Sequence, residues 1–195
     1  MTDLLAELFS SKVRAAVLGT LLPRPHLWFS LTELSRLLGL PVSSLQHECY
    51  KLARIGLLHD QRSGNVRRYS PQPHFPLLQP LTALVLASMP LSESLPAAAE
   101  GMSGVEQAWV TGEPGTRHAR PFLVVIGTLG IEELDALFER SRAAATAAGT
   151  GDIELAYYPS REWARRLENQ DPFVSSLATD IAVRLHTGAV PPEAT

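Results

Sequence analysis

The chain of 195 residues is poor in cysteine and lacks long apolar runs. Its single cysteine, Cys49, excludes an internal disulfide framework and a cysteine-rich zinc site. No apolar stretch approaches the roughly 18 residues that a membrane-spanning helix needs. The first residues, MTDLLAELFSSK, lack the basic and apolar regions of a secretory signal. We therefore expect a cytoplasmic protein without a membrane partner.

Motifs of several enzyme classes are also missing. No Gly-x-Ser-x-Gly marks a hydrolase nucleophile, and no Gly-Lys-Ser/Thr follows Gly112 and Gly115 to complete a phosphate-binding loop. The six histidines are scattered, with no Cys or Asp at metal-ligand spacing from them. We therefore predict no metal site and no cofactor.

Lysine is scarce, with two Lys against 15 Arg, and the charges are unevenly distributed. Residues 1–88 hold nine Lys/Arg and five Asp/Glu, a net charge of +4, whereas residues 89–195 hold eight and fifteen, a net charge of −7. A basic segment joined to an acidic one is typical of a nucleic-acid reader tethered to another domain. A chance distribution is the alternative.

Helix signals dominate the first part of the chain. Apolar residues recur at helical spacing through LLAELFSSKVRAAVLGTLLP, where Ser10 or Ser11 is expected to cap the second piece. Ser30 or Thr32 is expected to begin the next helix, and Gly39 to end it in a left-handed conformation. Together these signals predict a series of short helices before residue 40.

The segment VSSLQHECYKLAR predicts a further helix, and a hairpin follows it. One buried stripe is expected at i, i+3, i+7 and i+10, formed by Val42, Leu45, Cys49 and Leu52. Cys49 is expected to pack in the core, because a redox thiol needs an exposed, activated position. Two β-tolerant runs then flank Ser63-Gly64-Asn65, and Gly-Asn between such runs predicts a β-hairpin.

The end of the first part is almost entirely apolar. A proline-bounded helix is predicted from Phe75 to Ser88, with Leu81 near its middle. A helix this apolar is expected to bury itself on another domain or on a partner chain, so it is the candidate interface of a homodimer. Residues 89–103, rich in Pro, Ser, Ala and Gly, predict a linker with some helical content near its middle.

Residues 104–190 show a different pattern. Strands are predicted over VEQAWVTG, FLVVIG and DIELAYYP, and helices over IEELDALFERSRAAATAAG, SREWARRLENQ and PFVSSLATDIAVRLHTG. This order favours a small mixed sheet covered by helices, so the fold class of the chain is predicted as α+β. The aromatic residues of this part are expected in its core. They are Trp109, Phe122, Tyr157, Tyr158 and Trp163.

The segments LTELSRLLGLPVSSLQHECYKLARIGLL and RSGNVRRYSP resemble those of ArsR-like winged-helix bacterial regulators, and the resemblance covers residues 8–88. It implies a winged helix-turn-helix whose second helix enters the major groove of double-stranded DNA. A solvated helix face and a solvated hairpin edge are the alternatives. The candidate DNA-binding residues are Ser43, Ser44, Gln46, His47, Tyr50, Lys51, Arg54, Arg62, Asn65, Arg67 and Arg68.

Residues 104–188 resemble a minimal nucleotidyltransferase domain of the kind fused to such winged helices. In that family a Gly-Ser turn receives the triphosphate and an Asp-x-Asp binds Mg²⁺. The stretch WVTGEPGTRHARPFLVVIG keeps the frame, but Glu113 replaces the serine, and Arg120 and Phe122 replace the aspartates. The resemblance thus implies the fold without the catalysis, so the chain is predicted not to be an enzyme. The candidate anion or ligand pocket is formed by Gly112, Glu113, Arg117, His118 and Arg120.

These observations predict a homodimeric, sequence-specific DNA-binding transcriptional regulator. Its second, nucleotidyltransferase-like domain would serve dimerisation or the sensing of a small-molecule or nucleotide effector. Two alternatives stay open, namely an active Mg²⁺-dependent nucleotidyltransferase and a winged-helix module that binds another protein. Asp152 and Glu154 are expected to face water rather than to form a catalytic carboxylate pair.

Overall fold

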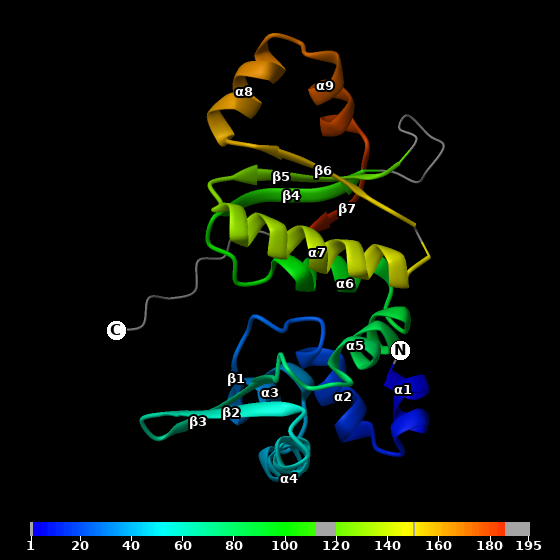
Figure 1. Ribbon diagram of the computed structural model, residues 1–195, viewed down its shortest axis with the longest axis vertical. Coiled ribbons are helices and arrows are strands. Elements are labelled where there is room, and N and C mark those ends of the chain that lie inside the picture. Colours follow the sequence, from blue (N-terminus) through cyan, green and yellow to red (C-terminus); the bar gives the residue numbers. More distant parts are fainter. Residues whose placement is uncertain (1, 112–119, 150, 186–195) are drawn as a thin grey trace. The chain divides into compact units, whose positions relative to one another are not determined.

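The computed structural model describes residues 2–111, 120–149 and 151–185. Their fold is mixed α+β with two small sheets (Figure 1), which agrees with the predicted fold class. The chain divides into two compact units, Met1–Met89 and Pro90–Thr195, and each is described by itself. Within the described ranges, no helix has the length and apolar character needed to cross a membrane.

The first unit combines short helices with a small antiparallel sheet. The helices are α1 (Thr2–Phe9), α2 (Lys12–Leu21), α3 (Leu31–Leu38), α4 (Val42–Arg54) and α5 (Leu78–Ala87). The strands are β1 (Phe29–Ser30), β2 (Leu58–Ser63) and β3 (Val66–Pro71). They pair in the order β1-β3-β2.

Local capping groups set the helix boundaries of the first unit. The Ser11 side chain accepts a hydrogen bond from the Arg14 backbone N–H at the start of α2. At the start of α3, Ser30 and Glu33 form a reciprocal capping box. Gly39 ends α3 with a φ of 64°, a conformation that glycine adopts without the strain of a side chain. The predicted helix starts and stops are confirmed at these positions.

The predicted hairpin is confirmed as β2 and β3. Leu58 pairs with Pro71 and Ser63 pairs with Val66, so two residues form the loop. Gly64, the first of the two, has a φ of 59°. A positive φ at this position is typical of the primed turns that match the twist of paired strands.

The core of the first unit corrects the predicted stripe of α4 at one position. Leu45, Cys49 and Leu52 are buried, but Val42 is 43% exposed. Val42 is the first residue of α4, and burial in this helix begins at Leu45. Glu48 is buried on the same side of the helix. The inner face of α4 thus contains a carboxylate that the apolar pattern did not predict.

The apolar helix α5 is shorter than predicted and packs partly within its own unit. Val85 is fully buried in the core of the first unit, and Leu78 and Leu81 pack against that core. Leu77 and Leu84 are 58% and 41% exposed. Part of the apolar surface of this segment is therefore covered without a second domain or a second chain.

The second unit contains a four-stranded sheet between two pairs of helices. Its elements are α6 (Leu91–Ala99), β4 (Val105–Thr111), β5 (Phe122–Gly127), α7 (Ile131–Ala147), β6 (Glu154–Tyr158), α8 (Ser160–Glu168), α9 (Pro172–Thr179) and β7 (Ile181–Leu185). The strand order is β6-β5-β4-β7, in which β5 and β6 are parallel and the other pairs antiparallel. Figure 1 shows α6 and α7 on one face of the sheet and α8 and α9 on the other.

Two elements of the second unit differ from the sequence-based expectation. Residues 89–103 were expected as a linker with some helical content, and they do contain a helix, α6, but its Leu95 and Ala97 are fully buried, so this segment is packed within the second unit. The segment from Pro172 onward, predicted as one helix, leaves the helical conformation after Thr179 and continues as strand β7. The β-branched residues of β7 favour an extended chain. Its pairing with β4, at least 70 residues earlier, is a non-local contact that periodicity alone does not show.

Of the five aromatic residues predicted in the core of the second unit, Trp109 and Trp163 are buried there, Phe122 and Tyr158 are partly buried against it, and Tyr157 is also only partly buried. The Trp109 and Trp163 side chains are buried, with their ring centroids 5.5 Å apart in an edge-to-face arrangement. The Trp109 indole donates a hydrogen bond of 2.9 Å to the Leu177 carbonyl. A buried indole N–H that is satisfied in this way fixes α9 to the sheet.

Candidate nucleic-acid interface

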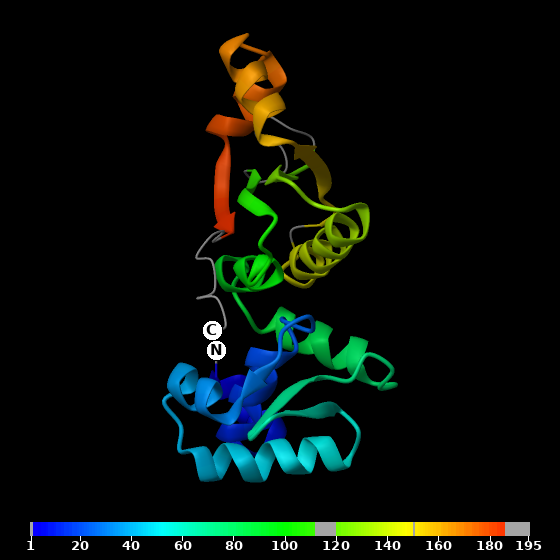
Figure 2. The ribbon, with the colours of Figure 1, turned by 90° about the vertical axis from the view of Figure 1, so that its left-hand side faces the viewer.

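Helix α4 presents a continuous polar face to solvent. Figure 2 shows the helix along one edge of the first unit, and its 13 residues span about 20 Å. Positions at i, i+3, i+4, i+7 and i+11 share one face of a helix. Here all five are exposed, and they are Ser43, Gln46, His47, Tyr50 and Arg54. Ser44 and Lys51, both partly buried, flank this face.

The exposed face of α4 carries no carboxylate, because the acidic residue of this helix points inward. Glu48 is 5% exposed, and its Oε1 accepts a hydrogen bond from the Arg14 Nε at 2.5 Å. The Arg14 guanidinium also donates to the Phe9 carbonyl at 3.3 Å. This arginine therefore connects the end of α1, helix α2 and helix α4. The remaining charges of α4, Lys51 and Arg54, lie in its last turn, where cations interact favourably with the helix dipole.

Apolar packing fixes the inner side of α4. Leu45, Cys49 and Leu52 are buried against the core of the first unit. Burial raises the pKa of the Cys49 thiol to about 12. This cysteine is therefore a neutral packing residue, as predicted, and α4 is held by both apolar contacts and the Arg14–Glu48 pair.

The β2–β3 hairpin places two arginines directly opposite each other. Arg62 pairs with Arg67 in the strand register, and like charges at opposed positions destabilise a hairpin. Asp60 compensates one of them, since its Oδ2 lies 3.3 Å from the Arg67 Nε. Within the described part of the chain, no carboxylate lies within ion-pair distance of Arg62. An external anion at this face would relieve the repulsion.

The other face of the hairpin carries Arg68, beside the start of α3. Arg68 pairs with Ser30 on β1 and with Gln61 on β2. Burial acts to raise the pKa of Glu33, but hydrogen bonds with Ser30 and the positive charges of Arg68 and Arg36 outweigh it and lower the pKa. Asn65, in the loop of the hairpin, is exposed. All eleven predicted DNA-binding residues thus lie on α4 or on the hairpin, in one compact unit.

Most residues of the predicted anion pocket lie outside the described part of the chain, namely Gly112, Glu113, Arg117 and His118. Arg120 is described, and its Nη1 lies 3.6 Å from the Asp152 Oδ2, with both side chains well exposed. The Phe122 ring packs edge-to-face on the Phe173 ring, with centroids 5.4 Å apart. Over residues 2–111, 120–149 and 151–185, no three His, Cys, Asp or Glu side chains come together as a metal site.

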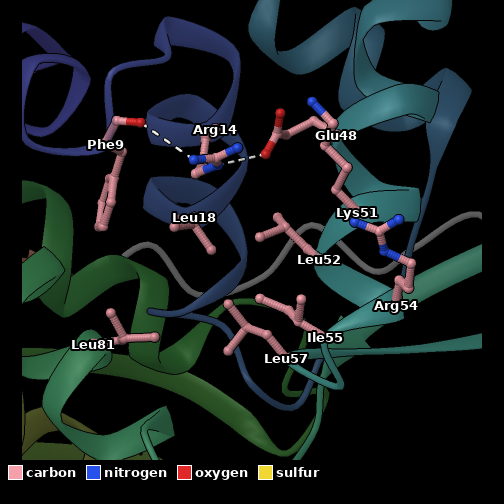
Figure 3. A pocket seen from close by; sticks show the side chains of 10 residues that line it. All are labelled: Phe9, Arg14, Leu18, Glu48, Lys51, Leu52, Arg54, Ile55, Leu57 and Leu81. Carbon is pink, nitrogen blue, oxygen red and sulfur yellow. Dashed lines mark hydrogen bonds and ion pairs between the residues drawn. The ribbon is translucent and has the colours of Figure 1, made fainter.

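A groove of about 340 Å³ opens in the first unit (Figure 3). Its apolar lining is Phe9, Leu18, Leu52, Ile55, Leu57 and Leu81, and its charged lining is Arg14, Glu48, Lys51 and Arg54. Sequence reasoning missed the groove, because its lining comes from α1, α2, α4, the segment after α4, and α5. A glutamate three residues after Leu45, within an otherwise apolar stripe, was the sequence signal that a buried ion pair lies there.

Comparison of the chain with protein-family models, curated proteins and solved structures finds no match.

Proposed function

We propose that this protein is a bacterial, sequence-specific DNA-binding transcriptional regulator. In this proposal α3 and α4 are a helix-turn-helix, α4 is the recognition helix, and the β2–β3 hairpin is the wing. Two observations in the same compact unit carry the proposal. The exposed face of α4 is polar and carries no carboxylate, and among the described residues no carboxylate lies within ion-pair distance of Arg62 on the hairpin. The proposal includes a cytoplasmic location, because bacterial genomic DNA lies in the cytoplasm.

The chemistry of the α4 face suits the edges of base pairs. The major groove is about 12 Å wide and admits one α-helix. Gln46 can form two hydrogen bonds with adenine, and Arg54 or Lys51 can donate to guanine O6 and N7. On the hairpin, Arg62 and Arg68 offer charge to phosphates, which positions the protein without reading sequence. Each class of contact thus has a residue of suitable chemistry at the surface.

The specificity of the α4 face can be measured by selection from a pool of duplexes of random sequence. Duplexes that the full-length protein retains are expected to share a short motif, and the variant Gln46→Ala is expected to lose preference at one position. The loss is about 1–3 kcal/mol for a bidentate base contact. Arg161→Ala, which removes an exposed cation of α8, is the matched control and is expected to select the wild-type motif.

Two outcomes of this selection would contradict the proposal. If no motif is enriched, sequence-specific reading by α4 is wrong. If duplex DNA is not retained at low salt, the alternative of a protein-binding winged helix gains support, and its partner would bind independently of salt.

For the second unit, we infer a nucleotidyltransferase-like domain without catalysis that serves dimerisation or ligand sensing. The inference is supported by the side chains at the positions of the family's two aspartates. Arg120 is cationic and pairs with Asp152, and Phe122 packs on Phe173. Neither Arg nor Phe supplies the carboxylate oxygens that Mg²⁺ prefers. Incubation with labelled ATP and Mg²⁺ is expected to label neither the protein nor added acceptors, whereas Mg²⁺-dependent transfer would support the enzyme alternative.

Dimerisation is part of the same proposal, because one winged helix contacts only a short half-site. The exposed apolar side chains of Leu77 and Leu84, at and within α5, support an interface there. Leu84→Glu is expected to yield monomers in sedimentation velocity, since it places a charge in an apolar contact. Gln79→Glu, an exposed position of the same helix, is the charge-matched control. A wild-type protein that sediments as a monomer would contradict the dimer.

A further inference from the structure

We propose that the groove of the first unit binds a small amphipathic carboxylate and that this ligand competes with DNA. All ten lining residues of the groove belong to the unit Met1–Met89. The binding of the ligand is independent of the proposed function. The competition with DNA rests on it, because it assumes that α4 reads DNA.

The apolar lining of the groove suits a hydrocarbon or aromatic body. Leu18, Leu52 and Leu57 are nearly fully buried, and Figure 3 shows their side chains between α2 and α4. Ile55, at the end of α4, is 59% exposed and lies at the solvent side of the groove. An apolar ligand would cover this side chain and remove it from water, which is favourable in proportion to the area covered.

The surface of the groove is almost entirely apolar, and the charged side chains at its border favour an anionic head group. Three cations and one carboxylate line it, and the carboxylate of Glu48 is already engaged by Arg14. Within the described residues, no acidic side chain lies within ion-pair distance of Lys51 or Arg54. A carboxylate at the groove would therefore meet two uncompensated cations, and an arginine can bind it with two parallel hydrogen bonds. A cationic head group would meet repulsion at the same place.

The volume of the groove limits the ligand to a small molecule. A volume of about 340 Å³ lies near the lower end of the range for ligand pockets, which is roughly 300–1,000 Å³. It corresponds to roughly eleven molecules of liquid water at about 30 Å³ each. An unbranched carboxylate of eight carbons is of this size, so octanoate is a suitable probe.

The competition with DNA follows from the position of two residues. Lys51 and Arg54 line the groove and also belong to the predicted DNA-binding set. A carboxylate that pairs with them takes away cations that would otherwise meet guanine or phosphate. Because the coupling between two ligands is reciprocal, DNA must weaken octanoate binding by the same factor by which octanoate weakens DNA binding.

The groove is tested by calorimetric titration of the full-length protein with octanoate in the absence of DNA. We expect one site with a Kd on the order of 0.1–1 mM, as ligand efficiencies allow for about ten non-hydrogen atoms. Ile55→Glu, which places a carboxylate at the solvent side of the groove, is expected to weaken binding at least tenfold. Val66→Glu makes the same change at an exposed residue of the hairpin outside the groove and is expected to bind as wild type.

The role of the head group is tested with octanol and with the double variant Lys51→Met, Arg54→Met. This variant is expected to bind octanoate at least tenfold more weakly than the wild type while its affinity for octanol is unchanged.

No saturable octanoate binding by the wild type, or equal binding by Ile55→Glu, would overturn the site. If octanoate binds but does not displace duplex DNA from a protein that does bind DNA, only the competition is wrong. Failure of the protein to bind DNA at all would count against the proposed function and leave the groove site intact.

Discussion

Replacing Arg14 by methionine would leave the buried carboxylate of Glu48 without its partner. The Glu48 side chain is 6% exposed and that of Arg14 is 34% exposed, with 2.5 Å between Nε and Oε1. Removing one partner of a fully buried pair costs about 3–5 kcal/mol, because the other charge stays buried and uncompensated. Since Arg14 is about one third exposed, water reaches the site once the guanidinium is gone, and we expect a smaller loss of about 2–3 kcal/mol.

The double variant Arg14→Met, Glu48→Leu separates the ion pair from the loss of packing. Replacing both members of a buried pair by apolar residues of similar volume is often neutral or stabilising. We therefore expect the double variant to be more stable than Arg14→Met alone, with a coupling free energy of about 2 kcal/mol, within the range seen for directly contacting residues.

Scanning calorimetry of the full-length protein measures this effect, and hydrogen exchange of the α4 amides assigns it to the first unit. A loss of about 2–3 kcal/mol is expected to lower the Tm of a unit of this size by roughly 10–20 °C. Arg142→Met breaks the well-exposed pair with Glu139 and is expected to leave the Tm unchanged. A Tm decrease of Arg14→Met no larger than that of Arg142→Met, or additive effects in the double variant, would refute the assigned role of the Arg14–Glu48 pair.

Three further predictions concern positions away from this pair. The pKa of Glu33 is lowered in the folded protein, so its stabilising effect is full above the unfolded pKa and is lost as the pH falls through the folded pKa. In Glu33→Gln, the free energy of unfolding should therefore depend less on pH in this acidic range. An unchanged pH profile would contradict the capping box with Ser30. Gly127→Ala should lower the free energy of unfolding in urea by about 3 kcal/mol, because the Cβ of the new alanine would clash with the Gly104 carbonyl oxygen. A variant as stable as the wild type would show that the backbone relaxes around this contact. Cys49, with a pKa of about 12, should resist thiol reagents at pH 8 until urea is added, and rapid labelling of the folded protein would contradict its burial.

Signals that act over a few residues were sufficient to predict much of the first unit. Ser30 and Gly39 mark the ends of α3 because capping and the left-handed conformation depend on neighbouring backbone groups. The Gly64-Asn65 loop predicts the hairpin for the same reason. The positions of the predicted DNA-facing side chains follow from these boundaries and from helical periodicity.

Features that depend on distant contacts were not predicted. Glu48 is buried because Arg14, 34 residues earlier, compensates its charge, and nothing in the sequence of α4 identifies this distant partner. Strand β7 follows a helix in an apolar stretch, and its extended conformation is stabilised by pairing with β4. The groove is lined from α1 to α5, so it exists only once those segments have packed.

The salt dependence of duplex binding tests most directly whether α4 and the hairpin bind DNA. For each phosphate that a cation neutralises, the slope of log K against log salt concentration changes by about 0.9. The wild type is expected to bind a selected duplex with a steep negative slope, and the triple variant Lys51→Ala, Arg62→Ala, Arg68→Ala to bind with a slope that is smaller in magnitude by about 2–3. Arg161→Ala should keep the wild-type slope. A wild-type affinity that does not change with salt, or a triple variant with the wild-type slope, would contradict DNA binding through this surface.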